Sequence, residues 1–242
     1  MQADYGDKYP AREFSQSIFT FQQLFSQIYD SLAKGPKSKS RISGELATET
    51  SFEFGFSYPG SLGVALIMPS AASLFGSKYD ETVEAFLSVM EIDNEDDVRK
   101  TVSEMGKAVV SRAYNWSKAN YSGNFGANVS WRTTSGTQRA GNISRNQFGR
   151  IVDIIGQTSD KEISRLETNG VLIGIDAKTN RFRFVEPSGS DYAGIVADSL
   201  DLSIDWAINT SYLATIEIEA VTKYATDKTN QSYKLVSLQQ NA

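Results

Sequence analysis

The 242-residue sequence predicts an α+β N-terminal domain, built from two β-hairpins and about four helices, followed by a small all-β barrel. Two observations predict this fold class. Before residue 158, apolar residues recur at helical spacing in several long segments, and paired strand-like runs lie between them. After residue 160, short apolar strands follow one another between turn residues. We therefore expect two domains, 1–158 and 159–242.

Four segments of the first domain carry apolar residues at steps of three and four, the spacing of an amphipathic helix. The first ends at Gly35-Pro36, a strong helix stop. Asp93 is expected to cap the third, because acids follow it in the first turn, where the helix dipole favours carboxylates. The four predicted helices are 11–33, 79–91, 94–120 and 145–155.

Two hairpins are expected between these helices. In the first, Phe52, Phe54 and Phe56 alternate and should share one face of a strand. The second strand of this hairpin is a near-continuous apolar run, which predicts that it is well buried. A Thr-Ser-Gly turn marks the other hairpin. The predicted strand pairs are 42–58 with 62–68, and 127–132 with 138–143.

The C-terminal region has three strands, then a short helical or irregular piece at 197–202, then two more strands. The five predicted strands are 165–176, 181–186, 192–196, 212–223 and 233–238. This order resembles that of an OB-type barrel, and an SH3-like barrel stays open as the alternative.

One barrel strand has a clear alternation of residue types. Phe182 and Phe184 should fill the barrel, which leaves Arg181 and Arg183 facing outward. These two arginines are therefore candidate surface residues for a ligand or partner.

The composition excludes many kinds of catalysis. The chain has no His and no Cys, so it lacks a Ser-His-Asp triad, a thiol nucleophile and the usual zinc or haem ligands. No apolar run approaches the roughly 20 residues that span a bilayer, and the N-terminus has no apolar signal segment. We expect a cytoplasmic protein without membrane association, metal or cofactor.

The charge is arranged in blocks, although the net value is only −5. Eight acids and no base lie between Lys78 and Arg99, and seven bases and no acid lie between Glu104 and Asp153. The basic block, with Trp131 beside it, could bind phosphate or an acidic partner. It could equally pair with the acidic block of the same molecule. The candidate binding residues are Lys107, Arg112, Lys118, Trp131, Arg132, Arg139, Arg145 and Arg150.

Motifs for catalysis are incomplete. The acids from Asp93 onward resemble a calcium loop, but Val98 stands where an EF-hand needs Gly. Tyr114 and Lys118 have the spacing of a short-chain dehydrogenase pair, but no Gly-rich dinucleotide turn accompanies them. A carboxylate-dependent hydrolase stays open, with Glu49, Glu53 and Asp176 among its candidate acids at strand ends.

The prediction for function is a non-catalytic intracellular interaction protein, such as an adaptor, a regulator or a subunit of a complex. Its partner is expected to be another protein or a second copy of the chain. The alternatives are a nucleic-acid or nucleotide binder that uses the Arg132, Arg139, Arg145 and Arg150 surface, and the hydrolase. The two-domain layout resembles bacterial proteins that end in a small barrel, which implies a prokaryotic or phage origin and a link to defence.

Overall fold

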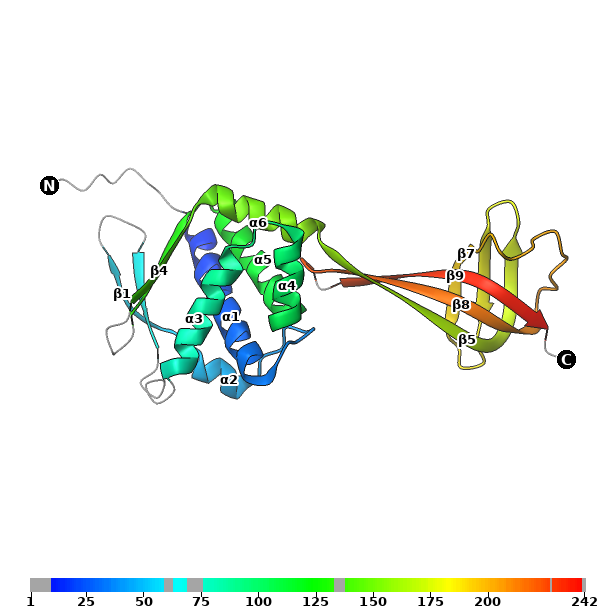
Figure 1. Ribbon diagram of the computed structural model, residues 1–242, viewed down its shortest axis with the longest axis horizontal. Helices are drawn as coiled ribbons and strands as arrows, with labels where there is room; N and C mark the ends of the chain where they lie inside the picture. Colours follow the sequence, from blue (N-terminus) through cyan, green and yellow to red (C-terminus); the bar gives the residue numbers. More distant parts are fainter. Residues whose placement is uncertain (1–9, 59–62, 69–75, 133–137, 227, 241–242) are drawn as a thin grey trace. The chain divides into compact units, whose positions relative to one another are not determined.

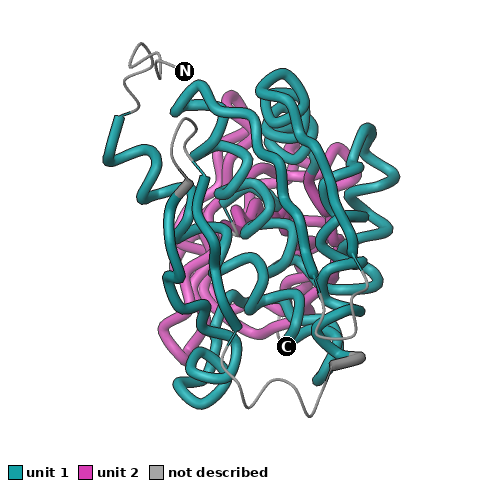
Figure 2. The backbone as a smooth tube through the Cα atoms, turned by 90° about the vertical axis from the view of Figure 1, so that its left-hand side faces the viewer, with its two compact units in different colours: residues 1–158, 223–227 teal, residues 159–222, 228–242 magenta. Residues whose placement is uncertain are grey.

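The computed structural model describes residues 10–58, 63–68, 76–132, 138–226 and 228–240 (Figure 1). The chain forms two compact units, coloured separately in Figure 2. Unit 1 consists of Met1–Thr158 together with Lys223–Asp227, and unit 2 of Ser159–Thr222 together with Lys228–Ala242. None of the described helices combines the length and the apolar character needed to cross a membrane.

Six helices are described in unit 1, where about four were expected. The predicted helix 94–120 is in fact two, because Gly106 interrupts it with a φ of 91°. Its cap is Asn94 and not Asp93, since the Asn94 side chain accepts a hydrogen bond from the Asp97 N–H at 3.0 Å. The helices are α1 Ala11–Lys34, α2 Gly44–Glu49, α3 Gly76–Met90, α4 Glu95–Met105, α5 Lys107–Ser122 and α6 Arg145–Gln157.

The helices pack around a buried core. Trp116 of α5 lies at its centre, with its ring 5.2 Å from Phe86 of α3 and 5.0 Å from Phe148 of α6. The same cluster includes Tyr224 and Ala225, which belong to unit 1 although they lie far along the chain from the helices. Unit 1 therefore takes part of its core from these two distant residues.

Two ribbons of two strands each complete unit 1. The second, β3 Ala127–Arg132 and β4 Gln138–Ile143, has the predicted limits. The first, β1 Glu53–Tyr58 and β2 Gly63–Ile67, differs from expectation in two ways. Residues 44–49 are helical instead of extended, and β2 is only partly buried, with Ile67 exposed.

A bulge also separates the two exposed phenylalanines of β1. Phe54 lies opposite Leu66, whereas Phe56 lies opposite Ala65. Leu66 and Ala65 are neighbours on β2 and so point to opposite faces. The expectation that Phe54 and Phe56 share a face is therefore wrong, because the extra residue in β1 reverses the alternation.

Unit 2 is a closed, mixed barrel with the order β5-β6-β7-β9-β8. Its strands β7 and β9 are parallel, which makes the barrel mixed. Phe182 and Phe184 are buried in the barrel as predicted, and residues 197–202, expected to be helical or irregular, form turns and bends. The strands are β5 Ser159–Asp176, β6 Arg181–Val185, β7 Asp191–Val196, β8 Thr210–Lys223 and β9 Lys228–Gln240.

Candidate functional site

Two arginines of the predicted basic surface form ion pairs with acids of the same unit. Arg139 on β4 forms an ion pair with Glu84 on α3, and this hydrogen bond raises the pKa of the guanidinium. Arg150 on α6 pairs with Asp93, between α3 and α4. Two of the four arginines proposed for nucleic-acid binding therefore have carboxylate partners inside unit 1.

Trp131 does not provide a free aromatic surface beside these arginines. Its indole Nε1 donates a hydrogen bond to Asp80 Oδ1 at 2.9 Å, and its ring lies 6.3 Å from that of Phe25. Phe148, the other aromatic residue near the basic block, is fully buried. Neither ring is placed to stack on an unpaired base.

The other basic candidates lie in separate places. Three of them lie over tyrosine rings: Arg145 over Tyr121 at 4.6 Å, Lys118 over Tyr114 at 5.6 Å and Lys107 over Tyr224 at 5.9 Å. Arg132 is exposed at the end of β3. Lys118 lines a shallow polar groove between α1 and α5, whereas Arg150 lines a different hollow with Asp93.

Arg112 forms hydrogen bonds within unit 1. Its guanidinium donates one hydrogen bond to Gln23 Oε1 at 2.6 Å and another to the Ser40 carbonyl at 3.4 Å. Burial lowers the pKa of this guanidinium. Arg112 therefore ties the segment after α1 to the α1–α5 pair, and the eight candidates do not gather into one open basic patch.

Among the barrel candidates and the candidate acids, Arg183 and Asp176 form local polar contacts. Arg183 donates hydrogen bonds to the Asp191 carboxylate at 2.7 and 3.1 Å, and these bonds lower the pKa of Asp191. Arg181 is exposed. Asp176 accepts hydrogen bonds from its own turn. Within the described part of the chain, no three acidic side chains gather in a group that could hold a metal ion.

The most unusual surface of unit 1 is the β1–β2 ribbon. Phe54 is 65% exposed, Phe56 53% and Ile67 50%. The cross-strand register places Phe54 on one face of the ribbon and Ile67 with Phe56 on the other. Both faces of the ribbon therefore present large apolar side chains to solvent.

The base of the ribbon is firmly held. The Gln22 side chain on α1 accepts a hydrogen bond from the Phe52 N–H at 2.7 Å and donates one to the Thr50 carbonyl at 2.7 Å. The Phe52 ring packs 5.6 Å from Phe21 and 4.9 Å from Phe25. These contacts fix the point at which β1 leaves the core.

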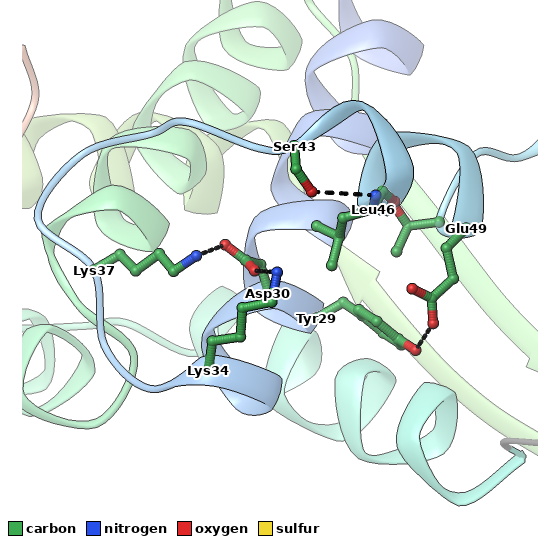
Figure 3. Close-up of polar contacts among 8 residues, drawn as sticks. Tyr29, Asp30, Lys34, Lys37, Ser43, Leu46 and Glu49 are labelled. Carbon is green, nitrogen blue, oxygen red and sulfur yellow. Dashed lines mark hydrogen bonds and ion pairs between the residues drawn. The ribbon is translucent and has the colours of Figure 1, made fainter.

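A polar cluster anchors α2, the element just before the ribbon (Figure 3). Tyr29 on α1 donates a hydrogen bond to the Glu49 carboxylate at the end of α2. Burial, together with this bond, raises the pKa of Tyr29. On the next residue, the buried Asp30 carboxylate forms ion pairs with Lys34 at 3.4 Å and with Lys37, in the segment that follows α1. The bond from Tyr29 to Glu49 fixes α2 against α1, and with it the start of β1.

Sequence reasoning missed the ribbon as a site, although the sequence carries a signal for it. No charged residue occurs between Glu53 and Lys78, in a chain whose charged fraction is 22%. An uncharged apolar run is typical of a buried strand, and the same pattern suits a strand that is covered by a partner.

Comparison with known protein families, with curated proteins and with solved structures finds no match to the chain. The exposed ribbon is therefore the feature that best supports a proposal about function.

Proposed function

We propose that the chain is a non-catalytic interaction protein, an adaptor, regulator or complex subunit that binds a partner protein through the β1–β2 ribbon. One observation carries the proposal: Phe54, Phe56 and Ile67 are exposed on a ribbon in which Glu53 is the one charged residue among those described. Exposed apolar groups that gather at one place commonly mark a surface that a partner covers.

The form of the ribbon supports strand addition as the mode of binding. A two-stranded ribbon has an unpaired edge on each strand, with N–H and C=O groups open to another strand. Peptide partners use such edges, because backbone hydrogen bonds give affinity and the alternating side chains give specificity. The bonds of Gln22 to Phe52 and Thr50 fix the point at which the ribbon leaves the core.

The alternatives have less support. A polyanion would have to displace Glu84 from Arg139 and Asp93 from Arg150, and Trp131 is turned toward Asp80. A hydrolase would need two or more acids around one reacting atom, and Glu49 is engaged by Tyr29. As part of the same proposal we place the protein in the cytoplasm of a prokaryote or its phage, associated with defence.

The proposal is tested by affinity purification of the tagged full-length chain from native cells, with quantification of the proteins retained. We expect Phe54→Lys to lose at least one partner by about tenfold, because a charge opposes burial and edge pairing. Phe19→Lys is the matched control, since Phe19 is also an exposed phenylalanine, 56%, but lies on α1. Equal retention by the two variants would overturn the proposal.

A further inference from the structure

We infer that the loop between β7 and β8, residues 197–209, is a second interaction surface of the chain, which binds a basic, apolar segment of a partner protein. Figure 1 shows this loop projecting from the strands of unit 2. The inference goes beyond the proposed function, because it concerns unit 2 and a partner of a different chemistry. The structure describes residues 138–226 without a gap, so the loop and both flanking strands are described in full.

The loop is held against the barrel by its own backbone. The Tyr212 hydroxyl accepts a hydrogen bond from the Ala207 N–H at 3.1 Å and donates one to the Ala207 carbonyl at 3.2 Å. Two residues further on, the Asn209 N–H donates a hydrogen bond to the Leu172 carbonyl on β5 at 2.7 Å. These bonds fix the C-terminal half of the loop to the barrel.

The apolar residues of the loop divide into an inner and an outer set. Leu200, Leu202 and Trp206 form the inner set, which packs against the barrel core. The outer set is Ile204, which is 52% exposed, and Ile208, which is 56% exposed. Since the inner set supplies the contacts with the core, the two isoleucines are available to a partner, and removing them from water would favour binding.

The charges around the two isoleucines indicate which partner the loop suits. Seven acids and no base lie between Arg183 and Lys223. Three of these acids, Asp198, Asp201 and Asp205, lie in the loop and are exposed. Within the described part of the chain, none of the three forms an ion pair with a Lys or an Arg.

Other acids of the same stretch differ, because bases of unit 2 neutralise them. The ion pairs are Asp191 with Arg183 at 2.7 Å, Glu217 with Arg165 at 3.5 Å and Glu219 with Lys161 at 2.8 Å. The loop carboxylates are therefore the ones left to face the cations of a partner.

This combination favours a basic protein segment over other occupants. Nucleic acid and anionic lipid would be repelled by the three carboxylates. A metal ion has no support, because no three acidic side chains of the described residues gather in a group that could hold one. A partner with cations beside apolar side chains would match both the carboxylates and the isoleucines.

Fluorescence anisotropy of dye-labelled synthetic peptides, titrated with the purified full-length chain, tests the inference. A peptide of Lys, Leu and Gly should bind. Peptides with Glu in place of Lys, or with Ser in place of Leu, should bind at least about tenfold more weakly. Added salt should weaken the binding, because the paired charges are exposed. No binding of the first peptide, or equal binding of all three, would overturn the inference.

Two matched pairs of variants locate the site. Ile208→Ser should weaken binding of the Lys-Leu-Gly peptide about tenfold, whereas Ile163→Ser should not, since Ile163 is 55% exposed but lies near the start of β5. Asp205→Lys should weaken binding about tenfold, and more than Glu104→Lys, which makes the same change of charge at an exposed position of α4. Equal weakening within either pair would indicate non-specific attraction and reject the loop as the site.

The results separate this inference from the proposed function, because the ribbon belongs to unit 1 and the loop to unit 2. Loss of a native partner by Phe54→Lys, with no peptide binding, would keep the proposed function and reject the loop. Peptide binding that Ile208→Ser weakens and Phe54→Lys does not would support the loop by itself. Self-association of the purified chain that Asp205→Lys abolishes would assign the loop to a second copy and overturn the inference.

Discussion

Tyr224 provides a sharp test of the unit 1 core, because a residue from the turn between two barrel strands should control the stability of the helices. The side chain is 3% exposed, packs in the cluster around Trp116 and lies under Lys107 Nζ, 5.9 Å from its ring centroid. An aromatic side chain buries roughly 150–250 Å², worth about 4–6 kcal/mol at 25 cal/mol per Å². Tyr224→Ala should therefore destabilise unit 1 by about 3–5 kcal/mol.

The assay is urea unfolding of the full-length chain followed by tryptophan fluorescence, in a Trp206→Phe background. The remaining tryptophans, Trp116 and Trp131, both belong to unit 1 and report its unfolding. Tyr212→Ala is the matched control, because Tyr212 is also 3% exposed but lies in the barrel core. The reasoning is refuted if Tyr224→Ala moves the free energy of unfolding of unit 1 by less than about 1 kcal/mol, the size of an ordinary surface change.

The remaining predictions concern Tyr29 and Gly106. Burial and the bond to Glu49 raise the pKa of Tyr29, so its contribution to stability is full below about pH 10 and declines as pH rises further, by up to about 1.4 kcal/mol per unit. Between pH 9 and 11, the urea midpoint of Tyr29→Phe should fall less steeply with pH than that of the natural chain. Equal slopes of midpoint against pH for the two chains would contradict this. Gly106→Ala should cost more than about 2 kcal/mol, because its Cβ would lie 2.2 Å from the Lys37 backbone nitrogen at a φ of 91°. In thermal unfolding, the helical control Gly156→Ala, with nothing nearer than 3.9 Å, should cost nothing.

Local sequence patterns were sufficient to predict the features that depend on residues close together in the sequence. The limits of β3 and β4 were predicted to the residue, because turn-forming residues in the sequence separate two short runs of strand residues. The predicted Thr-Ser-Gly turn itself lies outside the described residues. Phe182 and Phe184 were placed in the barrel by alternation alone. Strand limits and alternation depend on residues that are neighbours in the sequence, so they can be predicted from a single sequence.

Tertiary contacts decided the features that were missed. The apolar stripe continues from Met105 to Val109 at helical spacing, so periodicity predicted one helix across Gly106. The break lets the Lys37 carbonyl accept a hydrogen bond from the Ala108 N–H at 3.0 Å, a contact across about 70 residues. The position of Tyr224 in the unit 1 core could not be predicted for the same reason. It depends on a tertiary contact between residues far apart in the sequence.

The sequence analysis placed the candidate binding residues on the basic block, whereas the proposed surface, the β1–β2 ribbon, lies outside that block. The fold brings Glu84 to Arg139 and Asp93 to Arg150, across 55 and 57 residues, so two arginines of the basic block have acidic partners in unit 1. Surface pairs of this type stabilise a fold little, yet they remove the bare charge that a polyanion would need. The segment between Glu53 and Lys78 belongs to neither block and, among its described residues, exposes Phe54, Phe56 and Ile67. Where arginines of a basic block are paired with acids of the same unit, a stretch without charge is the more informative sign of an interaction surface.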